Sequence, residues 1–465
     1  SSDLSQVFLG FHPKYGHNHL DPLNLTLYAK RQELLPDLGY THNSFYRYFS
    51  ISTMGHNTVV VDGSDMQVND VSRHGGNIEA FAAGDLAQVM RASYDSAYAV
   101  TDEYSRELWY IPFAGGRSDQ AYMLDLFRVS GGSRHEYTLQ GAANRDAAFI
   151  TDLTLHEYGE YLLPPGTKVV EPVNNSDSGS AEGHYPGYIY VRDVKQAELA
   201  GDQYELTLQT GNERTGWGSS LRIIGLLEDE KNELYLGRSP SLRSIRVSGR
   251  SMDNNDEAVK HTMPKMVLRR EGANANLKSK FITVLEPYYV EQGSLIETVE
   301  LLPLDQGPDG AVALKVVYGD IADLIFSNPH DPDQPVIAGE AALYGRMGII
   351  RLQNGEVAEM MLFGGERLEF GKTVLAGAAK AEGNVLATMR KAAGDSIDAL
   401  VTDVHVPDEA AGHYVIVTHP DERTTGYQIK EVRHEQGSSV IVLAEQDPDL
   451  KLGTTGRLSR NFIRK

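Results

Sequence analysis

Cysteine is absent from this chain of 465 residues. Disulfides are therefore excluded, and any metal site must use His, Asp, Glu or backbone oxygen. The chain also lacks an apolar run of the ~18 residues that a membrane helix needs. Its first residues, SSDLSQVFLGF, contain neither a basic segment nor a long apolar stretch, so no signal peptide is visible. We expect no membrane partner. The cysteine-free composition fits an exported bacterial protein, and the expected location is secreted or periplasmic.

The chain has fewer basic than acidic residues. The chain has 43 Lys and Arg against 64 Asp and Glu, and its net charge is −21. This balance argues against a nucleic-acid partner, because phosphate binding favours a basic surface. An anionic substrate must instead be met by a local basic patch within an acidic field. Hydrophobic residues make up 41% and charged residues 23%, which predicts a globular chain with a large core and more than one domain.

Sustained helical periodicity is also rare, and two-residue alternation takes its place. In LNLTLY (residues 23–28) the leucines share one face of an extended chain, and the pattern recurs in HNTVVVDG, YELTLQT and HYVIVTH. The predicted fold class is all-β: a large antiparallel stacked-sheet domain, or super-sandwich, at residues 1–370 and a small C-terminal β-sandwich at residues 371–465. The best helix candidate is Ala378 to Gly394, and two glycines weaken it.

Two histidines and two aspartates crowd the run KYGHNHLDPLNLTLYAKRQELLPDLGY (residues 14–40). His17 and His19 are two residues apart, so both project from one face of an extended segment. Asp37 precedes a turn glycine, and His56 opens the strand-like HNTVVVDG. Neutral imidazoles and one carboxylate form a common zinc shell with a fourth position open. Spacing alone leaves two alternatives: a metal site, or buried histidines that only hydrogen-bond to the backbone.

Asp21 completes a literal HxHxD, which is the zinc motif of metallo-β-lactamase-like hydrolases. Pro22 stands where that family needs another histidine, and the alternating βα pattern of its fold is missing. Both features argue against that hydrolase.

A longer pattern is more specific. YGHNHLDPLNLTLYAKRQELLPDLGY, followed by YRYFSISTMGHNTVVVDG, resembles the β-domain signature of heparinase II/III-like polysaccharide lyases. RELWYIP, YMLDLFRVSGGSRHEYTLQG and FITVLEPY extend the resemblance in order over roughly the first 290 residues. The resemblance implies metal ligands at His19, Asp37 and His56, with zinc as the expected ion.

The resemblance also assigns catalytic and substrate-binding residues. It implies that His17 faces the cleft and takes part in catalysis. Tyr46 and Tyr48 fall where some relatives place a functional tyrosine, and the spacing does not choose between them. Arg47 lies between them and is the candidate contact for a substrate carboxylate. The metal either polarises that carboxylate or pins the loops and orients His17; we favour the second role.

The activity implied is β-elimination of a uronic-acid-containing polysaccharide such as alginate or a glycosaminoglycan. This reaction needs a neutralised carboxylate, a base for the C5 proton and an acid for the departing oxygen. Histidine (unperturbed pKa ~6.5) and tyrosine (~10) suit these roles. Two other functions stay open: a non-catalytic carbohydrate-binding scaffold with structural zinc, and a uronyl C5-epimerase. Family members usually carry an N-terminal helical toroid, so we expect a helical domain or chain as a partner that completes the cleft.

Overall fold

The structure is a computed structural model. It describes residues 5–12, 18–39, 47–68, 75–116, 120–142, 145–169, 185–211, 218–228, 232–241, 261–377, 382–420, 422–435, 437–444, 457–460 and 463–464. The chain divides into two compact units. The first comprises Ser1–Gly76, Ala92–Leu108 and Gly115–Ser294; the second comprises Asn77–Arg91, Trp109–Ala114 and Leu295–Lys465.

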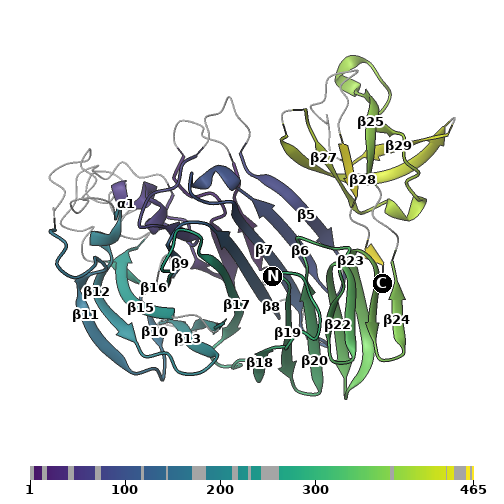
Figure 1. The fold of residues 1–465 in the computed structure, drawn as a ribbon. Coiled ribbons are helices and arrows are strands. Elements are labelled where there is room, and N and C mark those ends of the chain that lie inside the picture. Colours follow the sequence, from purple (N-terminus) through teal and green to yellow (C-terminus); the bar gives the residue numbers. More distant parts are fainter. Residues whose placement is uncertain are drawn as a thin grey trace. The chain divides into compact units, whose positions relative to one another are not determined.

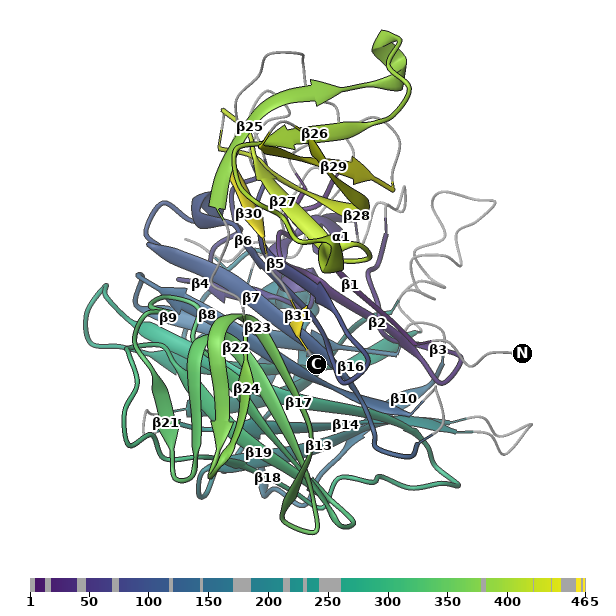
Figure 2. The ribbon, with the colours of Figure 1, turned by 90° about the vertical axis from the view of Figure 1, so that its right-hand side faces the viewer.

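The first unit contains three antiparallel arrays of strands (Figures 1 and 2). A three-stranded sheet has the order β1 (Gln6–Leu9), β2 (Leu25–Ala29), β3 (Gln32–Leu35). A six-stranded sheet has the order β11 (Leu155–Tyr161), β12 (Arg192–Ala197), β15 (Asn232–Pro240), β16 (Thr262–Glu271), β9 (Arg134–Gln140), β4 (Val59–Val61). The third array has the order β10 (Ala147–Ile150), β13 (Gln203–Thr210), β14 (Ser219–Leu226), β17 (Lys278–Tyr289), β8 (Ala121–Ser130), β7 (Glu103–Pro112, of which Glu103–Leu108 lies in this unit).

Two of these arrays pack face to face as a sandwich. Tyr137 of β9 stacks on Phe281 of β17, with ring centroids 5.4 Å apart, and its hydroxyl donates to Asp125 of β8. The opposite face of the six-stranded sheet carries a second apolar cluster that includes Val267, Tyr188 and Phe49. Because both faces of the sheet are covered, the side chains of β9 are buried at nearly every position and do not alternate between buried and exposed.

Helical structure in the described part of the first unit is limited to short turns. They are α1 (Arg47–Ile51), η1 (Thr53–Gly55), η2 (Asp95–Ala97) and η3 (Tyr188–Tyr190). The first two link the three-stranded sheet to β4, and Phe49 and Met54 anchor them in the apolar cluster. This link brings the segment before β4 to the start of β2.

The second unit contains a long-stranded sheet and a closed barrel. The sheet order is β18 (Thr298–Leu301), β19 (Val312–Tyr318), β20 (Ile321–Ser327), β22 (Ala341–Gln353), β23 (Glu356–Phe370), β24 (Thr373–Ala376), with β21 (Val336–Ala338) paired to β22 and β31 (Ile463–Arg464) to β23. The barrel order is β25 (Glu382–Met389), β26 (Ala399–Thr402), β29 (Ser438–Leu443), β28 (Thr424–Glu435), β27 (Tyr414–Thr418), β30 (Arg457–Arg460). The unit also holds β5 (Asn77–Ala83), residues 88–91 of β6 (Gln88–Ser93), η4 (Lys391–Ala393) and η5 (Asp408–Ala410).

The predicted all-β class of stacked antiparallel sheets is confirmed. The helix prediction at Ala378–Gly394 is wrong: Glu382–Met389 forms β25, which pairs with β26 and β30. Cross-strand pairing and burial of Val385 override an alanine-rich local pattern. The predicted boundary at residue 371 stays a prediction. Within the described residues, no helix has the length and apolar character to cross a membrane.

Candidate metal centre

Among the described residues, one group of three metal-ligating side chains converges: His19, Asp37 and His56. His19 Nδ1 lies 3.1 Å from His56 Nε2, and His56 Nε2 lies 3.5 Å from Asp37 Oδ2. His19 Nδ1 is 3.9 Å from Asp37 Oδ1. One potential ligand atom from each residue falls within 4.8 Å of the other two. The three residues singled out in the sequence as ligands are therefore neighbours in space.

The local fold explains why three separate segments meet. β3 pairs antiparallel with β2, so the chain after β3 returns beside the start of β2. Asp37 lies two residues after β3, and Asn24 lies immediately before β2. Asn24 Nδ2 donates to Asp37 Oδ2 over 2.9 Å. His56 ends η1, and the Asn57 N–H after it donates to Asn24 Oδ1 over 2.9 Å. The two asparagines thus bring two of the ligands together.

Hydrogen bonds fix the orientation of the ligands. His56 Nδ1 lies 2.8 Å from the carbonyl oxygen of Ser52, so Nδ1 carries the proton and Nε2 keeps its lone pair. Asp37 Oδ1 accepts from the Gly39 N–H over 2.6 Å. The carboxylate is thereby held at both oxygens, with its side chain 32% exposed, while both imidazoles are buried.

The electrostatics favour a neutral imidazole at His19. Burial, followed by the nearby His56, lowers the pKa of His19, and Asp37 partly opposes this. A neutral imidazole is the form that binds a metal.

Two of the three donor separations are close to those around one divalent ion, and the third, His19 Nδ1 to Asp37 Oδ1, is longer at 3.9 Å. With Zn–N bonds of ~2.0–2.1 Å in a tetrahedral shell, two nitrogens lie ~3.3 Å apart. The imidazole pair at 3.1 Å and the nitrogen–oxygen pair at 3.5 Å are close to that spacing. The set has two imidazoles, one carboxylate and no thiolate, which suits zinc with one position open.

A second layer of buried polar side chains supports the ligands, and it was not found from the sequence. Asn57 Nδ2 donates to the carbonyls of Leu25 (2.9 Å) and Pro36 (3.1 Å), and its Oδ1 accepts from the Gln140 N–H. Arg106 Nη1 donates to the carbonyls of Leu23 (2.7 Å) and Asn57 (2.6 Å). Asn57 therefore ties the β2 and β3 segments to β9. No sequence signal distinguishes it beyond its place after His56.

Gln140 extends this layer to a buried lysine. Gln140 Nε2 donates to the carbonyl of Gly55 over 2.5 Å, and Lys265 Nζ donates to Gln140 Oε1 over 3.2 Å. Lys265 is fully buried, and this burial lowers its pKa to about 7. No carboxylate contributes to that shift, so the amine is neutral over part of the physiological pH range.

The remaining predicted site residues fall into two groups. His17 and Tyr46 lie outside the described residues. Tyr48 and Arg47 lie in α1. The Tyr48 phenol hydrogen-bonds to Asp65, and its ring packs on the apolar cluster around Phe49. The Arg47 side chain is partly exposed.

Asp21 is not a member of the ligand group. Its Oδ1 lies 3.7 Å from His12 Nε2 instead. Among the described residues, His19 therefore groups with Asp37 and His56 and not with Asp21 of the literal HxHxD motif.

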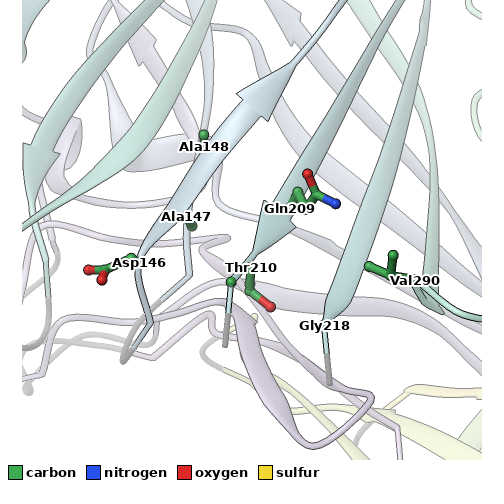
Figure 3. A pocket seen from close by; sticks show the side chains of 8 residues that line it. Asp146, Ala147, Ala148, Gln209, Thr210, Gly218 and Val290 are labelled. Carbon is green, nitrogen blue, oxygen red and sulfur yellow. The ribbon is translucent and has the colours of Figure 1, made fainter. Parts of the chain in front are cut away.

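An open pocket of about 440 Å³ lies elsewhere in the first unit, at the ends of β10, β13 and β14 (Figure 3). Asp146, Gln209 and Thr210 are among the residues that line it. None of the predicted site residues lines this pocket, and no metal-ligating group converges there among the described residues.

Residues 7–115 match the family model described as "Heparinase II/III-like, C-terminal". This segment holds all three converging ligands. The match covers under a quarter of the chain and agrees with the resemblance to a heparinase II/III-like β-sandwich inferred from the sequence.

Solved structures similar to this chain include heparan sulfate lyase HepC from Pedobacter heparinus, at 14% identity and a TM-score of 0.40, covering 70% of this chain and 38% of that one. A heparinase III gene product matches at 13% identity and a TM-score of 0.41, covering 76% and 39%. Heparinase III matches at 10% identity and a TM-score of 0.38, covering 67% and 36%. This chain thus spans well under half the length of each of these proteins. None of the curated proteins compared matches the chain.

Proposed function

We propose that this chain is the metal-binding β part of the catalytic cleft of a polysaccharide lyase. The substrate is a uronic-acid-containing polysaccharide, such as alginate or a glycosaminoglycan, and the reaction is β-elimination. The observation that carries the proposal is the convergence of His19, Asp37 and His56 within a segment that matches the heparinase II/III-like family.

We propose Zn²⁺ as the ion, held by His19 Nδ1, His56 Nε2 and the Asp37 carboxylate. When bound, it supplies a fixed positive charge that joins three chain segments and orients the residues beside it. The buried imidazoles and the two hydrogen bonds on Asp37 support this orienting role over direct contact with substrate.

The chemistry itself is assigned to residues next to the ligands. β-Elimination requires a base that takes the C5 proton and an acid that protonates the departing oxygen. His17, two residues before His19, is proposed as the imidazole that meets the sugar acid. Of the two tyrosines, we propose Tyr46 as the proton-transfer group, because the Tyr48 phenol is engaged by Asp65. Arg47 is proposed to contact a substrate carboxylate.

We further propose that a helical domain or chain completes the cleft. This is supported by the fraction of the solved lyases that the chain spans, 36–39%. An exported location, secreted or periplasmic, accompanies the proposal because the expected substrates are extracellular polymers.

A second function has one specific observation in its favour. Both imidazoles are buried, and Asn57 and Asn24 already lock the ligand segments together. Buried ligands and interlocked segments are equally expected of a carbohydrate-binding scaffold in which zinc only stabilises loops.

An absorbance assay separates these functions. The purified protein is mixed with alginate, hyaluronan, chondroitin or heparan sulfate, and unsaturated uronate is followed near ~232 nm. A lyase produces this absorbance with at least one polymer. An epimerase changes uronate stereochemistry, visible by NMR, without it. Binding with neither change, when the helical domain or chain that completes the cleft is present, identifies the scaffold and contradicts the lyase.

Two histidine variants test the division of roles. His17→Ala is expected to abolish turnover while the metal content and thermal midpoint stay at parental values. His19→Ala should lose metal and stability together, because a ligand is removed. Equal loss of zinc in both variants would show that His17 is a ligand and not a catalytic residue.

A further inference from the structure

We propose that β1 carries a binding subsite for an acidic sugar, next to the candidate metal centre. The subsite consists of Phe8, His12 and Tyr28, which we name the β1 strip. The class of ligand, a uronate-containing oligosaccharide, rests on the proposed function. The site itself rests on the exposed side chains described below.

Two exposed aromatic side chains share one face of the three-stranded sheet. In the β1–β2 register Gln6 pairs with Tyr28 and Phe8 with Thr26, so these four residues lie on one face. Phe8 is 57% exposed and Tyr28 39% exposed. Among the large apolar side chains exposed in the described part of the chain, these two are the aromatic ones. Diagonal neighbours on a sheet face are ~7–8 Å apart, within reach of a single sugar unit and its linkage.

His12 continues this face beyond the end of β1. A Cβ added to Gly10 would lie 3.5 Å from the Phe8 ring and 3.9 Å from the His12 ring, so the two rings flank residue 10 on one side. The His12 side chain is 39% exposed. Its Nε2 lies 3.7 Å from the carboxylate of Asp21, which is 8% exposed. A buried carboxylate thus lies beside an exposed imidazole.

The strip leads to the metal centre. The Gly10 N–H donates to the carbonyl of Asn24, whose side chain holds Asp37. His12 and Asp21 both lie close enough to His19 to act on its charge. A polymer that follows β1 toward the ligands therefore meets Phe8 first and His12 next.

The chemistry of the strip matches an acidic sugar. A pyranose ring has an apolar C–H face that packs on an aromatic ring, and its hydroxyls and acid group lie at the edge. The His12 imidazole N–H can donate to a carboxylate or sulfate at that edge. A purely apolar ligand could not accept a hydrogen bond from His12. Asp21, which the metal centre does not take up, thereby has a function: it positions His12.

Calorimetric titration with size-defined oligosaccharides of alginate, hyaluronan and heparan sulfate tests this subsite. Phe8→Ala and His12→Gln should each weaken binding of the best oligosaccharide about tenfold, and Phe8→Trp should retain it. Ile150→Ala is the matched control, because Ile150 is an apolar side chain of the first unit with a similar exposure, 53%. It should bind like the parent. Thermal midpoints confirm that each exposed-site variant folds.

Each result is decisive. Binding by Phe8→Ala equal to that of the parent, an equal loss in Ile150→Ala, or no binding by the parent overturns the subsite. The proposed lyase fails separately. If the protein binds through Phe8 and His12 but releases no unsaturated uronate with its helical domain or chain present, the subsite stands and the activity is lost. Cleavage with an unchanged KM in Phe8→Ala keeps the activity and loses the subsite.

Discussion

Lys265 illustrates how one buried side chain sets a pH dependence. Its pKa is about 7 in the folded chain against 10.5 for an unperturbed lysine. The unfolded chain therefore binds the proton more tightly, and folding is penalised increasingly as the pH falls from about 10.5 toward 7. Below pH 7 the penalty is complete.

Replacing this amine by an apolar side chain should stabilise the protein. Lys265→Met is expected to raise the unfolding free energy by about 4 kcal/mol at pH 7, since each pKa unit is worth ~1.36 kcal/mol. The gain should shrink as the pH rises to 10. Denaturant unfolding at pH 7, 8.5 and 10 measures it, with the exposed Lys195→Met as control. A variant that is less stable at every pH would mean that the folded chain needs the ammonium.

Asn57 is the residue on which the arrangement of ligands depends most. Its side chain bonds to the carbonyls of Leu25 and Pro36 and to the Gln140 N–H, all buried. Asn57→Ala should cost about 3 kcal/mol, because three backbone groups lose their partner without gaining water. It should also weaken metal affinity. Asn384→Ala, which removes an exposed bond to Asp403, is the control and should cost well under ~1 kcal/mol. Equal losses in the two variants would contradict the role of Asn57.

Among the elements, the strands show how far sequence reasoning reaches. Alternation in residues 23–28 correctly predicts a strand, because Leu25 and Leu27 of β2 face the core. The sequence did not predict β25, because alanine and lysine favour a helix locally, whereas the pairing partners of β25 lie 10–77 residues away along the chain. Local propensity carries no information about those partners.

The strand assignment of β25 makes a prediction about neighbouring residues. Val385 is 1% exposed and Leu386 is 47% exposed, as expected when successive side chains point to opposite faces. Val385→Ala should destabilise the barrel by about 1–2 kcal/mol, and Leu386→Ala by less than ~0.5 kcal/mol. Chemical denaturation of the two variants measures the difference. Equal effects would argue against a strand with one buried face.

For the whole molecule, the metal site shows what spacing can and cannot predict. His17 and His19 attract attention because they are only two residues apart, whereas Asp37 and His56 come from other segments and only the family resemblance linked them to His19. The sequence did not indicate the supporting residues Asn24, Gln140 and Arg106, because each acts through a hydrogen bond with a backbone group far away in the sequence. The residues that converge are those the resemblance implied; the residues that hold them emerge only from the fold.

Elemental analysis of protein purified without added metal or chelator tests the central claim most directly. The parent should carry a stoichiometric amount of divalent metal, with zinc predominant, and Asp37→Ala and His56→Ala should lose it along with part of their thermal stability. The surface variant Ile150→Ala should keep it. A parent without bound metal after zinc is offered, or ligand variants that bind as much as the parent, would contradict a centre formed by His19, Asp37 and His56.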